Sequence, residues 1–332
     1  MNVLVTGAAG FIGSSTAAAL MARGDRVVGI DNINDYYDVE LKHARLRRLT
    51  DEFGDLFRFK RIDFSDAQEL NSGLVGADFD RIIHLGAQAG VRYSIQNPGA
   101  YVRSNLVGHC NVLEMARQRG SSHFVYASSS SVYGGNTNLP FRVEDRVDHP
   151  LSLYAATKKA DELITESYAN LFRVPATGLR FFTVYGPWGR PDMAMWIFLK
   201  ALMEDRELPL FNGGDMRRDF TYIDDIVAGI IACLDNPPAD NGELKAGGSH
   251  MPHALYNIGN SRSEHLMRVV DLLERQTNKK ARVKALPMQP GDVNDTFADI
   301  SAIQRDHGYQ PTTTIDQGIP QFVDWYRRYH EV

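Results

Sequence analysis

The segment Val3-Leu4-Val5-Thr6-Gly7-Ala8-Ala9-Gly10-Phe11-Ile12-Gly13 decides which fold we expect for this chain. It opens with a run of the residues that favour strands, has glycines at 7, 10 and 13, and continues into an apolar helical pattern. A second short strand, 27–30, ends at Asp31. The pattern predicts a strand, a tight turn and a helix whose N-terminus faces a pyrophosphate.

Each chemical element that a dinucleotide site needs has a candidate here. Gly7 and Gly10 let the backbone turn and approach the pyrophosphate, and Gly13 lets the helix pack closely on the sheet. Asp31 can accept hydrogen bonds from a ribose diol and would repel a 2′-phosphate, so we expect NAD rather than NADP. An ordinary structural turn is the alternative, but strand, turn, helix, second strand and acid occur in the order that a nucleotide site requires.

The composition limits the possible functions. The 332 residues are 43% hydrophobic, which suffices for one large or two ordinary domains, and the net charge of −5 provides no basic field for nucleic acid. No apolar run reaches the ~18 residues of a membrane span, and we see no signal peptide. Cys110 and Cys233 are isolated and the ten histidines lack ligand spacing, so we expect a cytoplasmic protein without disulfide or metal.

Short strands alternate with longer periodic segments along the chain, which is typical of βαβ units and a parallel sheet. We therefore expect an α/β protein: a Rossmann-type doubly wound parallel sheet over 1–180, and a smaller C-terminal α/β substrate domain over 181–332, with some segments crossing back to the first. The boundary is placed where Gly and Pro become dense after a predicted strand. Arg45, on a predicted basic helix, is expected on a solvated face.

A second candidate site feature lies in the middle of the chain. Ser152-Leu153-Tyr154-Ala155-Ala156-Thr157-Lys158 opens a predicted helix, and the i, i+4 spacing places Tyr154 and Lys158 on one helix face. Such a pair often arises by chance. Here it follows a dinucleotide-type segment and a serine cluster, 128–131, at a predicted strand end.

These segments, together with 180–187 and 218–225, resemble in their order the extended short-chain dehydrogenase/reductase family, and in particular its NAD-dependent nucleotide-sugar epimerases. The GxxGxxG spacing is the form seen in that family. The nearest likeness is to UDP-glucuronate 4-epimerases. The resemblance implies conversion of UDP-glucuronate to UDP-galacturonate through a transient 4-keto sugar; a UDP-glucose/UDP-galactose 4-epimerase and a non-catalytic nucleotide-sugar or NAD-binding relative remain alternatives.

The resemblance also implies roles for individual residues. Tyr154 would remove the proton of the C4 hydroxyl while hydride passes to the nicotinamide, and Ser129 would hold the reacting oxygen. A free tyrosine, with a pKa near ~10, is a poor base at neutral pH, so the positive charge of Lys158 and of the oxidised nicotinamide would favour the phenolate. The remaining cofactor contacts implied are Phe11, Ile12, Asn32, Asp63, Phe64, Leu85, Ala87, Gln88 and Asn105.

Substrate contacts are implied in the same way, with surface ion pairs or ordinary loops as alternatives for several of them. Arg218 would bind the diphosphate and Asp292 the uridine ribose. The other substrate contacts implied are Arg92, Ser128, Ser129, Ser130, Thr183, Arg190, Phe211 and Asn212. The helices predicted near 98–119 and 152–172 pair in dimers of the family, so we expect a homodimer.

The serine cluster and one arginine discriminate among the reactions of this family. Dehydratases of the family place Asp-Glu where Ser130-Ser131 stand, and decarboxylases place Glu at 131, so hydroxyls at both positions favour simple epimerisation. Arg190 can bind a carboxylate bidentately. With Thr183 and the serine hydroxyls it would clamp the carboxylate of the uronic acid and hinder loss of CO2.

Overall fold

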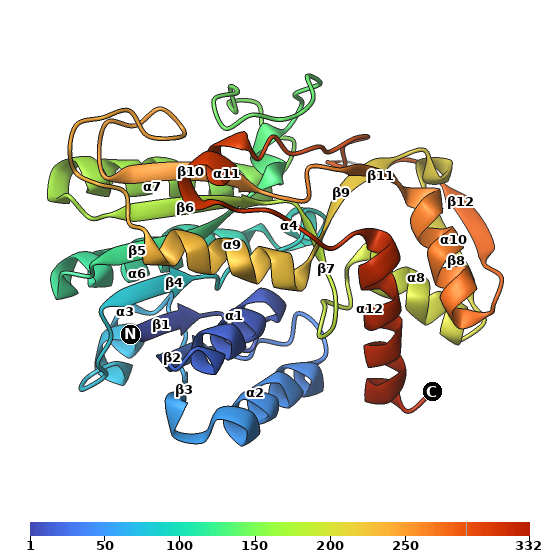
Figure 1. Ribbon diagram of the computed structural model, residues 1–332, viewed down its shortest axis with the longest axis horizontal. Coiled ribbons are helices and arrows are strands. Elements are labelled where there is room, and N and C mark those ends of the chain that lie inside the picture. Colours follow the sequence, from blue (N-terminus) through green and yellow to red (C-terminus); the bar gives the residue numbers. More distant parts are fainter. Residues whose placement is uncertain (290) are drawn as a thin grey trace.

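A parallel sheet forms the centre of the molecule (Figure 1). The computed structural model describes residues 1–289 and 291–332. Seven strands lie in the order β10-β6-β5-β4-β1-β2-β3, and every neighbouring pair is parallel. Their bounds are Asn2–Thr6 (β1), Arg26–Asp31 (β2), Phe57–Arg61 (β3), Arg81–His84 (β4), His123–Ser129 (β5), Ala176–Phe181 (β6) and His253–Ile258 (β10). The predicted Rossmann-type sheet is confirmed.

Helices cover both faces of this sheet. One face carries α1 (Phe11–Ala22), α2 (Val39–Phe53) and α9 (Ile223–Asp235); the other carries α3 (Ala67–Gly73), α6 (Gly108–Arg119) and α7 (Leu153–Phe172). Short helical segments connect them: α4 (Tyr93–Gln96), α5 (Pro98–Tyr101), a π-helical turn (Val102–Val107) and 3-10 turns at Gly54–Leu56 and Ser130–Tyr133. The helix expected over 98–119 therefore contains a π-helical turn in its first half.

The chain after β6 builds a smaller α/β part and also returns to the large sheet. The smaller part has a three-stranded sheet, β11-β9-β7, and a two-stranded sheet, β12-β8. Its strands and helices are Thr183–Tyr185 (β7), Glu207–Phe211 (β8), Arg217–Tyr222 (β9), Ser263–His265 (β11), Arg282–Leu286 (β12), Ala194–Met203 (α8), Leu266–Thr277 (α10), Ser301–His307 (α11) and Ile315–His330 (α12), with a 3-10 turn at Asn212–Gly214. Residues 263–265 (β11) pair antiparallel with β9.

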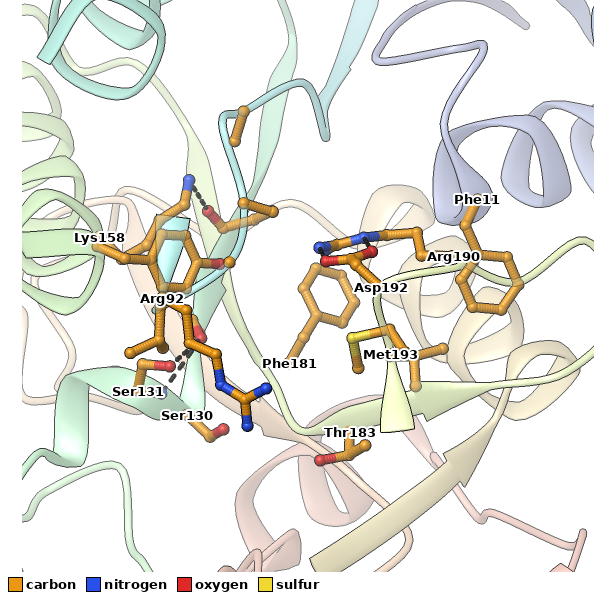
Figure 2. A pocket seen from close by; sticks show the side chains of 18 of the residues that line it. Phe11, Arg92, Ser130, Ser131, Lys158, Phe181, Thr183, Arg190, Asp192 and Met193 are labelled. Atoms are coloured by element: carbon orange, nitrogen blue, oxygen red, sulfur yellow. Dashed lines mark hydrogen bonds and ion pairs between the residues drawn. The ribbon is translucent and has the colours of Figure 1, made fainter. Parts of the chain in front are cut away.

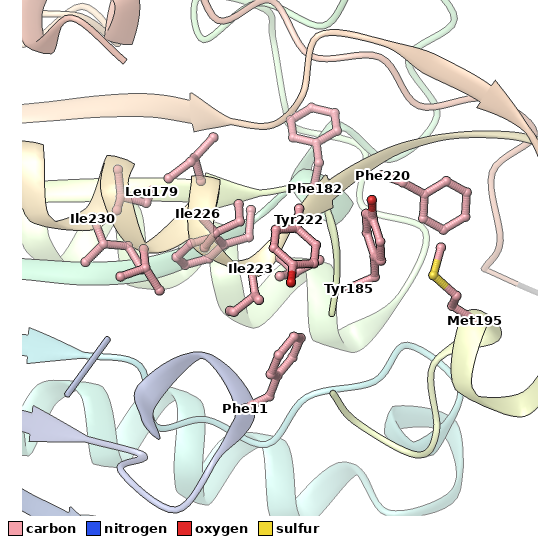
Figure 3. Close-up of a cluster of buried hydrophobic side chains, with 14 of the residues drawn as sticks. Phe11, Leu179, Phe182, Tyr185, Met195, Phe220, Tyr222, Ile223, Ile226 and Ile230 are labelled. Carbon is pink, nitrogen blue, oxygen red and sulfur yellow. The ribbon is translucent and has the colours of Figure 1, made fainter. Parts of the chain in front are cut away.

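A hydrophobic core connects the two parts. Figure 3 shows Phe11, at the start of α1, facing the side chains of Tyr222 and Ile223, where β9 ends and α9 begins. All three are buried. This packing fixes the position of the glycine turn relative to the smaller part. Among the described residues, no helix has the length and the apolar character needed to cross a membrane.

The expectation of a solvated Arg45 is wrong. Its side chain on α2 is fully buried, with 0% exposure. Nη1 donates to the Ala9 carbonyl (3.0 Å), Nη2 to the Gly189 carbonyl (2.8 Å) and Nε to the Trp188 carbonyl (3.1 Å). Arg45 therefore joins the glycine turn to the loop that follows β7. The i, i+4 pattern of the helix gave no sign of this role, because the carbonyls that it binds come from distant segments.

Candidate active site

A cavity of about 740 Å³ lies at the carboxyl ends of the central strands and extends between the large sheet and the smaller part. Such an edge is where open parallel sheets bind ligands. Most residues predicted from the sequence line it: Gly7, Gly10, Phe11, Ile12, Gly13, Asp31, Asn32, Phe64, Leu85, Ala87, Gln88, Arg92, Ser128, Ser129, Ser130, Tyr154, Lys158, Thr183, Arg190, Phe211, Arg218 and Asp292. Asp63, Asn105 and Asn212 are not among its lining residues.

The glycine turn has no space for larger side chains. Gly7 has a φ of +71°, and a Cβ there would lie 2.8 Å from the Gly86 nitrogen. A Cβ on Gly13 would lie 2.1 Å from the Gly7 carbonyl oxygen. Gly10 caps α1 without a side-chain hydrogen bond, which leaves backbone N–H groups at the helix N-terminus available to a ligand. The turn fits the pyrophosphate of a dinucleotide.

Asp31 is held at the end of β2 by backbone donors. The Ala9 N–H donates to Oδ2 (3.2 Å) and the Ile33 N–H to Oδ1 (2.8 Å). Burial raises the pKa of Asp31, while the nearby Lys42 ammonium acts in the opposite direction. Lys42 also lines the cavity, and Nζ donates to the Asn34 carbonyl (2.6 Å). A fixed acid at this point fits a ribose diol.

Two predicted cofactor residues support the lining from behind. Asp63 accepts a hydrogen bond from the Asn32 amide (3.2 Å). Asn105 lies on the π-helical turn, where its Oδ1 accepts from the Gln88 N–H (2.8 Å) and its Nδ2 donates to Thr157 (3.0 Å). The Asn105 side chain therefore links the segment that follows β4 to the helix that carries Tyr154 and Lys158. π-Helical turns often occur at functional sites.

The start of α7 places Tyr154 and Lys158 on the cavity wall. Ser152 caps this helix by accepting from the Ala155 N–H (3.1 Å), which fixes where the helix begins. Lys158 Nζ donates to the Ala127 carbonyl at the end of β5 (2.9 Å). The ammonium group is therefore anchored between the helix and the strand end.

The serine cluster continues directly from β5. Ser129 Oγ accepts from the Ser131 N–H (3.1 Å) and donates to the Ser131 hydroxyl (3.1 Å), which starts the 3-10 turn. The hydroxyl of Ser128 instead donates to Glu162 Oε1 (2.7 Å), a carboxylate that is buried and paired with Arg180 (2.8 Å). Ser128 borders the cavity, but its hydroxyl is engaged in the core.

A second charged group lies across the cavity from Lys158. Figure 2 shows Lys158 on one side and the pair of Arg190 and Asp192 on the other. Arg190 Nε donates to Asp192 Oδ1 (3.0 Å), and the Tyr36 hydroxyl donates to Oδ2 (3.1 Å). Burial acts to raise the pKa of Asp192, but the Arg190 guanidinium prevails and holds it below its usual value. Thr183 lines the same cavity at the start of β7.

Segments that are far apart in the sequence meet where Arg92, Phe211, Arg218 and Asp292 line the cavity. Arg92 Nη2 bonds Asp292 Oδ2 at 3.2 Å, and its guanidinium lies 4.3 Å from the ring centroid of Phe211.

The Arg218 guanidinium donates to the Asn294 carbonyl (2.7 Å), and burial lowers the pKa of Arg218. Asn212 donates to the Asp215 carbonyl (2.8 Å) and does not line the cavity. Pro290, in the segment before Asp292, lies outside the described residues.

Sequence reasoning did not name several polar lining residues, among them Tyr36, Lys42 and Asp192. Asp192 lies two residues after Arg190, so its proximity was available as a signal. Tyr36 and Lys42 follow Asp31 closely. Lys42 bonds the nearby Asn34 and Tyr36 bonds the distant Asp192, and no spacing rule indicated either contact.

The fold and the site are those of an extended short-chain dehydrogenase/reductase. The chain belongs to the GDP-mannose 4,6-dehydratase family, whose model matches residues 4–322. It is 46% identical to the CapI protein of Staphylococcus aureus, with 100% of both chains covered. It is also 46% identical to UDP-glucuronate 4-epimerase 4 of Arabidopsis thaliana, with 99% of this chain and 76% of that protein covered.

Solved structures show the same likeness. The crystal structure of UDP-glucuronic acid 4-epimerase from Bacillus cereus, in complex with UDP-glucuronic acid and NAD, matches with a TM-score of 0.87 and 34% identity. The match covers 99% of this chain and 100% of that one. These comparisons confirm the predicted fold class and the predicted membership among nucleotide-sugar epimerases of this family.

Proposed function

We propose that this protein is an NAD-dependent isomerase that inverts C4 of UDP-glucuronate to give UDP-galacturonate. The observation that carries the proposal is one cavity that holds a Tyr/Lys pair, a cluster of hydroxyls without carboxylates, and Arg190. Relatives named as UDP-glucuronate 4-epimerases support the same assignment.

NAD, held by the glycine turn and Asp31, would supply a reversible hydride acceptor. Tyr154 would take the proton of the C4 hydroxyl and return it after the 4-keto sugar has turned over. Lys158 would hold positive charge beside it from its anchor on the Ala127 carbonyl (2.9 Å). The Ser129 hydroxyl would orient the reacting oxygen, since its bonds to Ser131 fix its position.

The hydroxyls at 130 and 131 favour epimerisation over the family's other reactions. Elimination of water needs a positioned acid and base near the sugar, and this segment carries serines instead. This distinction matters because the family model is described by its dehydratase. We therefore propose that the 4-keto sugar leaves the site only after reduction.

Arg190 is proposed to bind the substrate carboxylate together with Thr183. Its Nε and Nη2 face Asp192, which leaves Nη1 for a second carboxylate. A 4-keto uronic acid is a β-keto acid, and holding its carboxylate in place would hinder loss of CO2. In Arg190→Ala we expect weaker binding of UDP-glucuronate and more CO2 per turnover; unchanged affinity and unchanged CO2 release would exclude the clamp.

The activity is tested by product analysis of purified protein with UDP-glucuronate and, separately, with UDP-glucose. We expect inversion of UDP-glucuronate, and loss of roughly 10²- to 10⁴-fold in Tyr154→Phe because the general base is removed. Tyr168→Phe, on the same helix, is the matched control and keeps the activity. Faster turnover of UDP-glucose would favour the UDP-glucose 4-epimerase alternative, and no turnover of either sugar would favour a binding relative.

We further propose a homodimer built on the face of α6 and α7. Large apolar side chains are exposed there or beside it: Val102 (44%), Val107 (45%), Leu163 (60%), Leu171 (67%) and Phe172 (47%). Large apolar patches on a protein surface mark interaction sites, and we propose that these side chains form one. Sedimentation of the wild type and of Leu163→Glu tests this: a dimer that the variant weakens supports it, and a monomeric wild type excludes it.

A cytoplasmic location is also proposed. Cys110 and Cys233 are both free thiols, as is usual in a reducing compartment. Fractionation of the source cells, with antibody detection, tests the location. Recovery in an extracytoplasmic fraction would exclude it.

A further inference from the structure

We propose that Asp161 is a positioning residue for Lys158, and that its negative charge sets the lower pH limit at which Tyr154 can act as a base. This inference rests on the proposed epimerase function. It concerns a carboxylate that lies behind the cavity wall and is not among the lining residues.

The helix places three functional groups in one line. Tyr154, Lys158 and Asp161 stand at i, i+4 and i+7 on α7, so they share one helix face. Lys158 Nζ lies 3.1 Å from Asp161 Oδ2 and 2.9 Å from the Ala127 carbonyl. Lys158 and Asp161 have side-chain exposures of 3% and 0%, so water screens this pair little. Two of the three ammonium hydrogens are thus committed, and the third remains for the cavity side.

The groups around Asp161 do not carry a competing charge. Burial lowers the pKa of His84, on β4, to about 3, and it lowers the pKa of His109, on α6, well below its usual value. Burial likewise raises the pKa of Cys110, on α6, and of Tyr126, on β5. All four groups are therefore neutral near pH 7.

The neighbouring carboxylate on the helix, Glu162, is already neutralised by Arg180 through contacts of 2.8 and 3.0 Å. Burial raises the pKa of Asp161 to about 6, against the opposing effect of Lys158, so it is ionised at and above neutral pH. Asp161 is thus the charge that offsets Lys158 most directly. A cation beside a phenol favours the phenolate, and a carboxylate behind that cation weakens the effect.

The sign and size of the effect follow from this geometry. Asp161→Asn keeps an oxygen for Lys158 and removes one negative charge. Seven residues of helix span about 10.5 Å, and one charge at that distance, in an effective dielectric near 20, changes a proton equilibrium by about one pH unit. The acid limb of the pH profile of kcat/KM should therefore move about one unit lower.

The experiment compares the pH profiles of kcat/KM for UDP-glucuronate in the wild type, Asp161→Asn and Glu166→Gln. Glu166, also on α7, pairs with His253 (2.7 Å) and undergoes the same change of acid to amide about 7.5 Å further along the helix. The acid limb should move in Asp161→Asn and stay in place in Glu166→Gln. A limb that stays within about 0.3 units of the wild type in Asp161→Asn, or that moves to higher pH, overturns the proposal.

A second measurement does not need turnover. Ultraviolet absorption reports phenolate formation, and subtracting the titration of a Tyr154→Phe background isolates Tyr154 in the wild type and in Asp161→Asn. The Tyr154 signal should appear at lower pH in Asp161→Asn, and coincident titrations would overturn the proposal. If the wild type does not epimerise any UDP-sugar, the proposed function fails, and this titration still decides the role of Asp161.

Discussion

Arg45→Met should destabilise the protein by about 3 kcal/mol. The substitution removes the guanidinium contacts of Arg45 to the carbonyls of Ala9, Trp188 and Gly189 and to the Tyr37 hydroxyl (2.7 Å), and leaves a side chain of similar length in a fully buried place. Each carbonyl that loses its donor inside the protein costs about 1 kcal/mol or somewhat more. Burial lowers the pKa of Arg45, because holding a positive charge inside the protein costs free energy. Methionine carries no charge, so the variant does not have this cost. We therefore expect a destabilisation of about 3 kcal/mol and not more.

The assay is equilibrium unfolding in urea, followed by circular dichroism, with Arg47→Met as the matched control. Arg47 lies on the same helix and is exposed, so its replacement should change the free energy of unfolding by less than about 0.5 kcal/mol. Arg45→Met should also raise the KM for UDP-glucuronate, because the loop that Arg45 binds leads directly to Arg190. Equal stabilities of the two variants would refute the reasoning.

Three other predictions follow from buried contacts. Gly13→Ala should reduce NAD affinity at least roughly tenfold, measured by calorimetry, because its Cβ would meet the Gly7 carbonyl at 2.1 Å; unchanged affinity would contradict the turn geometry. Glu162→Gln should lower the free energy of unfolding by about 3–5 kcal/mol because it leaves the Arg180 guanidinium buried without the carboxylate that balances its charge, and a loss below about 1 kcal/mol would contradict this. Burial lowers the pKa of His123 to about 4, so the unfolded state binds more protons than the native state between about pH 6.5 and 4, and stability falls as the pH falls. In His123→Gln the loss between pH 7 and 5, measured in urea, should be smaller by about 2 kcal/mol, and an equal loss would contradict the assignment.

Short-range rules account for only some of the predicted residues that line the cavity; the family resemblance supplied others, such as Arg92, Arg218 and Asp292. The glycine turn follows from three glycines between a strand and a helix, and Tyr154 and Lys158 follow from helical spacing. Both are local, and the structure brings them to one cavity. Strand β10 was missed because its buried residues include the polar His253 and Asn257, so neither a continuous apolar run nor a regular alternation marks it.

The contacts that sequence reasoning missed depend on chain segments that only the fold brings together. Tyr36 bonds Asp192 across 156 positions, and Arg92 bonds Asp292 across 200. Arg45 is a further example. Its place on a basic helix predicted a solvated side chain, but carbonyls from distant segments of the chain surround it. A single sequence does not indicate contacts between residues that are far apart in the chain, whereas the geometry of a helix or a turn is set by residues close together in it.

On the proposed epimerase function, the charges of the cavity would disfavour the elimination of water. Among the described residues that line it, the carboxylates are Asp31, Asp192 and Asp292. Asp31 accepts two backbone N–H groups, Asp192 is bound by Arg190, and Asp292 by Arg92. The Arg190 guanidinium holds the pKa of Asp192 below its usual value, which makes this carboxylate a poor proton donor to a leaving hydroxyl. On the proposed function, proton exchange with the sugar would then be left to Tyr154, and reduction would be the main exit of a 4-keto sugar.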